Sequence, residues 1–124
     1  MSARGVDMRG SIAERETVTL RHEYSRVRCR HNQKFPDEPF ISFPQFRQLS
    51  KAPCYYCNEP PMRVLKDEAT PLKIKINGLD RLDNDHGYSP DNVVPCCPIC
   101  NDAKGTMTEK QFQNWINRLV KYHS

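Results

Sequence analysis

Two pairs of cysteines carry the clearest chemistry in this chain of 124 residues. Cys54 and Cys57 form one Cys-x-x-Cys motif, and Cys97 and Cys100 form a second. Two thiolates with this spacing can bind one ion in a tight turn, and two such turns complete a tetrahedral zinc site. A site with four thiolates is closed, so the predicted zinc ion is structural rather than catalytic. Reduced cysteines without a metal are the alternative.

Two of the six cysteines lie outside these pairs. Cys96 is adjacent to Cys97 and could take its place, but Cys97 has the usual spacing to Cys100. Cys29 and Cys96 are therefore expected to be inert small hydrophobic residues.

A second concentration of chemical groups runs from Gly78 to Lys104, GLDRLDNDHGYSPDNVVPCCPICNDAK. It contains an acidic segment, a turn, a short apolar run and the second cysteine pair, followed directly by Asn101. The spacer of 39 residues between the two cysteine pairs is longer than in a simple zinc ribbon. We therefore expect further structure to be enclosed between them.

This segment resembles the HNH endonucleases, which have a ββα-metal (His-Me finger) fold. The shared motifs are Asp-Arg-x-Asp-Asn, Gly-Tyr, Asn-Val-Val-Pro and Cys-Asn, together with the two Cys-x-x-Cys pairs. The similarity is closest to small zinc-containing forms from bacteriophages and to resolvases of the recombination endonuclease VII type. It is strong from Cys54 to Lys104 and looser over the flanking helices. The resemblance implies an endonuclease that hydrolyses phosphodiester bonds in DNA.

The resemblance also implies a catalytic metal site. In the family, an Asp at the end of the first strand and a His or Asn on the helix bind one divalent cation, and these positions match Asp80 and Asn101. Mg²⁺ or Mn²⁺ suits such a site, because these ions prefer oxygen ligands and keep waters that a phosphate can replace. The middle Asn of the family motif matches Asn92, which is expected to brace the loop and orient the general base.

The general base is where the sequence departs from the family pattern. A His usually follows the metal-binding Asp directly, but this chain has Arg81, which stays protonated at neutral pH. Arg81 can instead hold a phosphate or stabilise charge in the transition state. His86 is the nearest candidate base. The alternatives are a water activated by the metal or by the phosphate, and an exposed turn histidine without a catalytic role.

Three functions from different classes follow from these residues. The leading hypothesis is a metal-dependent HNH endonuclease. Arg81 favours the alternative, a catalytically degenerate zinc-dependent module that binds nucleic acid or takes part in an assembly. The third hypothesis is a purely structural zinc protein that docks on another protein through its final helix.

The remaining elements must hold these groups in place. Residues 1–10 are predicted to be a flexible tail and residues 11–124 a single α+β domain. Its zinc and ββα-metal core spans residues 54–104, and helices flank this core on both sides. Only 37% of the residues are hydrophobic and ten are prolines, so the core is thin and needs a staple, either disulfides or a metal.

The N-terminal helix is predicted over residues 11–32, with one apolar face formed by Leu20, Tyr24, Val27 and His31. Residues 1–34 hold eight Arg and Lys against four Asp and Glu, whereas the rest of the chain is balanced. This distribution suits contact with the DNA phosphate backbone, although a solvated helix face would look similar. The predicted DNA contacts are Arg21, Arg26, Arg28, Arg30 and Lys104. Lys104 could equally be a solvated charge at the end of its helix.

Further elements are expected on either side of the first cysteine pair. A short helix should begin at Ser42, with Gln45 completing a capping box. Alternating apolar residues predict a strand over residues 72–76, and Asn77-Gly78 predicts a tight turn or bulge after it.

The last helix is predicted over residues 108–122. Thr108 and Gln111 form a capping box at its start. Its apolar stripe is expected to pack on the core and consists of Phe112, Trp115, Ile116, Leu119 and Val120.

The opening sequence MSARGVDMRGS lacks the apolar region of a secretory signal. No stretch approaches the ~20 apolar residues of a membrane span, so no membrane partner is expected. The predicted location is the cytoplasm of a bacterial host cell, with a phage gene as the source. Because that compartment is reducing, paired cysteines there favour zinc over disulfides. Nothing in the sequence specifies an oligomeric state.

Overall fold

The computed structural model describes residues 10–124, so the tail predicted at residues 1–10 lies outside this range except for Gly10. The fold is mixed α+β, as predicted. Its helices are α2 (Ile12–Lys34), α3 (Phe43–Ser50), α4 (Pro98–Lys104) and α5 (Glu109–His123). Its strands are β1 (Arg63–Lys66), β2 (Lys73–Ile76), β3 (Gly78–Arg81) and β4 (Val93–Cys96). None of the described helices is long and apolar enough to cross a membrane.

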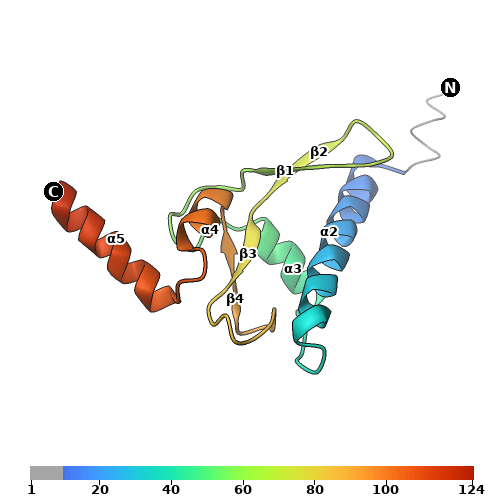
Figure 1. Ribbon diagram of the computed structural model, residues 1–124. Coiled ribbons are helices and arrows are strands. Elements are labelled where there is room, and N and C mark those ends of the chain that lie inside the picture. The colour runs from blue at the N-terminus through green and yellow to red at the C-terminus, as the bar shows by residue number, and fades with distance from the viewer. Residues whose placement is uncertain (1–9) are drawn as a thin grey trace.

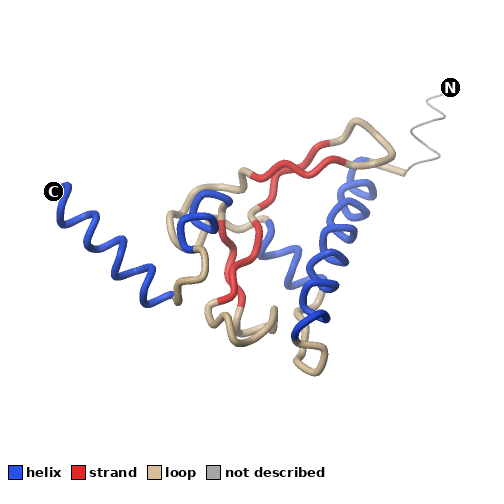
Figure 2. Tube along the Cα trace, in the orientation of Figure 1, coloured by secondary structure: helices blue, strands red, loops and turns tan. Residues whose placement is uncertain are grey.

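The strands form two antiparallel hairpins, β1 with β2 and β3 with β4. Figure 2 shows these hairpins end to end, with helices on both sides of the second one. In the second hairpin Asp80 lies opposite Val94 and Gly78 lies opposite Cys96. Helix α4 follows β4 after a single residue, so β3, β4 and α4 form the predicted ββα unit.

Asn77 joins the two hairpins, and the tight turn predicted at Asn77-Gly78 does not form. The side chain is fully buried. Its backbone N–H donates to Ser50 O at 2.9 Å, and its Nδ2 donates to Ala52 O at 3.0 Å and to Glu59 O at 3.3 Å. These bonds keep the chain extended from β2 into β3, because Asn77 satisfies backbone groups of the neighbouring segments instead of its own turn.

Helix α2 begins with a reciprocal capping box. The Ser11 side chain accepts from Glu14 N at 3.1 Å, and Glu14 Oε1 accepts from Ser11 N at 3.0 Å. The predicted apolar face is the buried one: Leu20, Val27 and His31 are each at most 3% exposed.

Helix α3 packs between α2 and the second hairpin (Figure 1). Ser42 caps it as predicted, but the Gln45 side chain bonds to Pro90 O at 2.8 Å and the capping box is incomplete. The main core lies between these elements and contains Leu20, Val27, Ile41, Phe46, Leu65, Ile76 and Val93.

Helix α5 begins at the predicted capping box but differs from the prediction over most of its length. Phe112 is buried against the ring of Tyr56, with ring centroids 5.0 Å apart. Leu119 and Val120 are 40% and 61% exposed. Figure 1 shows α5 extending away from the rest of the described chain. The prediction of a core-packing stripe is therefore wrong beyond the first two turns of α5, where the helix extends away from the rest of the described chain.

Candidate functional site

The four cysteines of the two motifs come together in space. The sulfur atoms of Cys54, Cys57, Cys97 and Cys100 all lie within 4.8 Å of one another. The Sγ atoms of Cys57 and Cys97 are 3.7 Å apart. In a tetrahedral site with zinc–sulfur bonds of about 2.3 Å, neighbouring sulfurs lie about 3.8 Å apart. The cluster therefore fits one tetrahedrally bound metal ion.

Backbone geometry builds each half of this cluster. After Cys54 and Cys57 the chain turns at Asn58, which adopts φ 64°, and Asn58 N–H donates to Cys54 O at 2.9 Å. Cys97 caps the N-terminus of α4, and its Sγ accepts from Cys100 N at 3.3 Å. Amide groups that point at sulfur stabilise thiolates, which are the metal-binding form of cysteine.

The two halves are linked by hydrogen bonds. Cys97 N–H donates to Cys54 Sγ at 3.3 Å, and Tyr55 N–H donates to Pro95 O at 2.8 Å. Burial disfavours the Cys54 thiolate, but amide hydrogen bonds from Cys97, Cys57 and Tyr56 outweigh burial and lower the pKa of Cys54 to about 7. Burial raises the pKa of Cys100.

The two remaining cysteines lie outside the cluster. Cys96 is buried, and its thiol donates to Cys97 O at 3.5 Å. Burial raises the pKa of Cys96, so this thiol stays protonated. Cys29 is exposed on α2 and does not pack as the predicted small hydrophobic residue.

Asp80 lies on β3 and faces two donors from other elements. Tyr56 OH donates to Asp80 Oδ2 at 2.7 Å. Lys104 Nζ, from the last turn of α4, lies 3.3 Å from Asp80 Oδ1 and 3.2 Å from Oδ2. Asp80 is 7% exposed and Lys104 is 1% exposed, so this is a buried ion pair. Burial, followed by the hydrogen bond to Asp80, raises the pKa of Tyr56 and keeps its hydroxyl as a donor.

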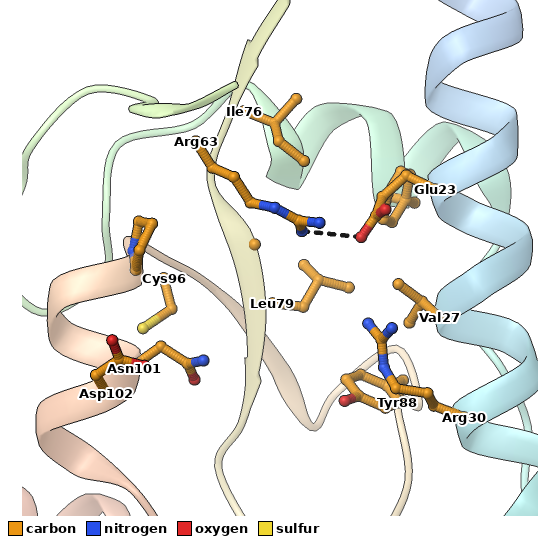
Figure 3. Close-up of a pocket in the computed structure, with 13 residues that line it drawn as sticks. Glu23, Val27, Arg30, Arg63, Ile76, Leu79, Tyr88, Cys96, Asn101 and Asp102 are labelled. Atoms are coloured by element: carbon orange, nitrogen blue, oxygen red, sulfur yellow. Dashed lines mark hydrogen bonds and ion pairs between the residues drawn. The ribbon is translucent and has the colours of Figure 1, made fainter. Parts of the chain in front are cut away.

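Asn101 lies one helical turn before Lys104 and is exposed. No hydrogen bond joins Asn101 to Asp80 among residues 10–124. Figure 3 shows the Asn101 side chain beside Cys96 and directed towards β3. It lines a cavity of about 360 Å³ that Arg30 of α2 also lines. α4 therefore presents an amide to this cavity and an ammonium to Asp80.

The oxygen donors of Asp80 and Asn101 suit Mg²⁺ or Mn²⁺. Lys104, however, already contacts both carboxylate oxygens of Asp80. The donor set therefore fits a divalent cation once the Lys104 ammonium has left Asp80.

Arg81 is held inside the loop that follows β3. Its Nη1 donates to Asn84 O at 3.3 Å and to His86 O at 3.1 Å. The guanidinium carbon lies 5.6 Å from the Phe35 ring centroid and 5.4 Å from that of Tyr88. The hydrogen bonds order the loop, and the positive charge lies near two aromatic rings.

His86 is exposed at the tip of the same loop and pairs with Glu38 from the α2–α3 connection. Its Nδ1 lies 3.1 Å from Glu38 Oε2, and its Nε2 lies 3.9 Å from Asp83 Oδ2. The hydrogen bond to Glu38 is the main cause of a raised pKa for His86. When the ring is neutral, Nδ1–H donates to Glu38 and Nε2 is left as the proton acceptor.

Asn92 braces this loop from within. Its Oδ1 accepts from Asp83 N at 3.0 Å, and its Nδ2 donates to Asp83 O at 3.0 Å and to Gly87 O at 2.9 Å. The Asp83 carboxylate accepts from Asp85 N at 2.9 Å, which makes a local turn. The Asn92 side chain thus fixes both ends of the segment from Asp83 to Gly87, which carries His86.

Sequence reasoning missed three residues that support the site. Tyr56 donates to Asp80, Glu38 holds His86, and His31 anchors the loop to α2. His31 is buried, its Nδ1 accepts from Tyr88 N at 3.0 Å, and its Nε2 lies 3.0 Å from Glu38 O. Only the position of Tyr56 inside the Cys-Tyr-Tyr-Cys motif gave a signal, because it had to lie near the metal-binding turn.

The arginines predicted to contact DNA have different surroundings. Arg21 stacks on the Phe43 ring at 4.1 Å, and Arg26 pairs with Glu23 at 2.9 Å. Arg28 and Arg30 are exposed, and Arg30 also lines the cavity beside Asn101. Arg30 is thus the arginine of this set that lies next to the candidate site.

Comparison with known proteins identifies the fold. No family model matches the chain. The structure is similar to a chain of the rare-cutting HNH restriction endonuclease PacI, with a TM-score of 0.57 and 19% identity. The match covers 83% of this chain and 78% of that chain. The predicted HNH-type fold is therefore confirmed, and at this identity the likeness concerns the fold alone.

One curated relative is viral. Over 78 residues the chain is 35% identical to the uncharacterized protein R423 of Acanthamoeba polyphaga mimivirus. This segment is 63% of the present chain but only 13% of the viral protein. The chain therefore spans a small part of the length of that relative.

Proposed function

We propose that this chain, which has the HNH-type fold, is a divalent-metal-dependent endonuclease that hydrolyses phosphodiester bonds in DNA. One observation carries the proposal: β3 and α4 bring Asp80 into contact with Lys104, and Asn101 lies one helical turn before Lys104 and directly after Cys100 of the four-cysteine cluster. The similar fold of an HNH restriction endonuclease supports the same chemistry.

We assign the four-cysteine cluster to a structural zinc ion. Cys100 directly precedes Asn101, and Cys97 caps the helix that carries Asn101 and Lys104. A metal held by these cysteines would fix the start of α4 relative to the turn that carries Cys54 and Cys57. The zinc site would therefore position the catalytic helix without taking part in the reaction.

Asp80 and Asn101 would hold the Mg²⁺ or Mn²⁺ ion. When bound, such an ion supplies polarisation of the scissile phosphate and stabilisation of the leaving oxygen. Asn92 holds the loop so that His86 keeps its orientation. The Nε2 atom of neutral His86 would take the proton of the attacking water while Glu38 holds Nδ1.

The test is nicking of supercoiled plasmid DNA by the zinc-loaded protein with Mg²⁺ or Mn²⁺. Asp80→Asn should abolish nicking, because it removes the charge of the only proposed carboxylate ligand. Asp37→Asn is the matched control, since Asp37 is exposed and lies outside the site. The proposal is wrong if duplex, single-stranded and branched DNA all remain intact with both metals, or if Asp80→Asn cleaves as well as the unsubstituted protein.

A second function is favoured by Arg81, which replaces the usual base histidine. Its Nη1 donates hydrogen bonds to two carbonyl oxygens, and its guanidinium lies near the Phe35 and Tyr88 rings. Arg81 therefore supports the loop here. A zinc-dependent module that binds nucleic acid without cutting it would keep this arrangement. It predicts DNA binding that weakens steeply with salt and no turnover with either metal.

The DNA contacts remain proposals. Arg30 beside the cavity and Arg28 on the exposed face of α2 are the best placed, whereas Arg21 and Arg26 have protein partners. The matched mimivirus protein supports a viral source for the chain. The phage origin and the cytoplasmic location stay predictions.

A further inference from the structure

Lys104 occupies the carboxylate that the catalytic cation needs. Its ammonium has three protons, and three acceptors lie near it: Asp80 Oδ1 at 3.3 Å, Asp80 Oδ2 at 3.2 Å and Arg81 O at 3.3 Å. The side chain of Lys104 is 0% exposed and that of Asp80 is 8% exposed. In this arrangement Lys104 has no proton left for a DNA phosphate.

The charges explain why a cation and Lys104 exclude one another. Asp80 carries one negative charge, and the Lys104 ammonium neutralises it at contact distance. Tyr56 contributes a neutral donor and no further negative charge. A divalent ion at Asp80 would meet an unscreened like charge in a buried setting, where repulsion between charges is stronger than in water.

We infer that Lys104 competes with the divalent cation for Asp80, and that DNA relieves this competition by drawing the Lys104 ammonium to a backbone phosphate. This inference rests on the proposed function. Lys104 lies in the last turn of α4, next to the exposed Gly105, and its ammonium is carried on a flexible four-carbon stem. The cation should therefore bind weakly to the free protein and more tightly to its DNA complex.

Such coupling is reciprocal by linkage. If DNA raises the affinity for the cation by some factor, the cation raises the affinity for DNA by the same factor. Coupling between two sites is typically about 5- to 150-fold. A device of this kind would keep the hydrolytic ion away from the protein until substrate is present.

The experiment titrates Mn²⁺ into the full zinc-loaded chain and follows free Mn²⁺ by electron paramagnetic resonance, with and without a short phosphorothioate duplex. This duplex keeps the backbone charge but resists cleavage. The variants are Lys104→Met, which keeps the length of the side chain without its charge, and Lys110→Met, an exposed matched control on α5. Lys104→Gln is the second variant in case Lys104→Met does not fold, and Asp80→Asn identifies the site.

We expect the duplex to tighten Mn²⁺ binding to the unsubstituted protein and to Lys110→Met at least about fivefold. Lys104→Met or Lys104→Gln should bind Mn²⁺ tightly without DNA, and the duplex should add little. Equal Mn²⁺ affinities of the unsubstituted protein and the Lys104 variants, each lost in Asp80→Asn, would overturn the inference and leave the proposed function intact. If no variant binds Mn²⁺ through Asp80 even with DNA, the proposed catalytic site fails together with the inference.

Discussion

His86, the proposed general base, forms a pair with Glu38. They come from different parts of the chain, and their contact at 3.1 Å couples the α2–α3 connection to the loop after β3. The same carboxylate also accepts from Gly87 N at 2.9 Å. Glu38 thus contacts both His86 and Gly87, and its hydrogen bond to the ring raises the pKa of His86.

Glu38→Gln should lower the pKa of His86 towards its ordinary value of 6.5. The raised pKa means that the ion pair stabilises the fold below about pH 6.5 and loses this contribution as pH rises through the folded pKa. With His86 as the base, cleavage needs the neutral ring, so the acidic limb of the pH–rate profile should move to lower pH in Glu38→Gln. An NMR titration of the His86 ring protons measures the pKa directly. An unchanged titration would show that Glu38 does not control the ring.

Gly87 shows how close packing at one residue supports the loop. A Cβ atom at this position would collide with the imidazole of His31, which is itself buried and bonded to Tyr88 N. The loop can therefore approach α2 only with glycine here.

Gly87→Ala should destabilise the protein by about 1–3 kcal/mol, because overpacking forces neighbouring groups to move. Gly78→Ala is the matched control, since its added Cβ would meet Cys96 O at 3.7 Å, an ordinary contact. Urea denaturation of both variants gives the free energies of unfolding. Equal losses in the two variants would contradict the role assigned to the contact with His31.

At the scale of elements, α5 divides into a packed start and an exposed remainder. Phe112 lies against Tyr56, whose hydroxyl donates to Asp80. The start of α5 therefore supports the candidate site through Tyr56. Tyr55 OH also donates to Glu109 Oε2 at 2.5 Å. This hydrogen bond attaches the first turn of α5 to the segment between Cys54 and Cys57.

Phe112→Ala should lower the free energy of unfolding by about 3–5 kcal/mol, because it leaves a cavity under Tyr56. Val120→Ala, on the exposed part of the same helix, should change it by less than about 0.5 kcal/mol. Thermal unfolding followed by circular dichroism compares the two. A large loss in Val120→Ala would mean that a partner covers the outer stripe in solution.

At the scale of the whole molecule, two separate clusters hold the chain together. The apolar core joins α2, α3 and the hairpins, whereas the cysteine cluster joins the turn with Cys54 and Cys57 to α4. α4 has seven residues and buries only Lys104. Its position therefore depends on the cysteine cluster more than on apolar packing.

Removing the proposed zinc ion should unfold the part of the protein that carries the candidate site. Zinc contributes about 10–16 kcal/mol in small zinc modules, which matches or exceeds the typical domain stability of about 5–15 kcal/mol. Cys54→Ser, or a strong chelator, should abolish the cooperative thermal transition and release bound zinc. Cys29→Ser should retain both, since Cys29 is exposed and outside the cluster.

Several features of the fold were predictable because they depend on local chemistry. The capping boxes at Ser11–Glu14 and Thr108–Gln111 and the cap at Ser42 depend on side chains within one turn. The four-cysteine cluster was also predictable, since only a shared metal site gives both Cys-x-x-Cys motifs a role. The ββα unit followed from the motif that joins Asp80 to Asn101.

The sequence by itself determined which residues are the candidates for metal binding and catalysis, because the cysteine spacing and the Asp-Arg to Cys-Asn motif are visible in the chain. The tertiary structure decided what those residues face. It places the Lys104 ammonium against the Asp80 carboxylate and the Glu38 carboxylate against the His86 ring. It lets the carbonyl oxygens of Asn84 and His86 accept hydrogen bonds from Arg81. It also left the outer half of α5 uncovered. The pairings of Lys104 with Asp80 and of Glu38 with His86 join residues from separate elements. A charge takes whichever partner the fold brings within contact distance, which no local pattern records.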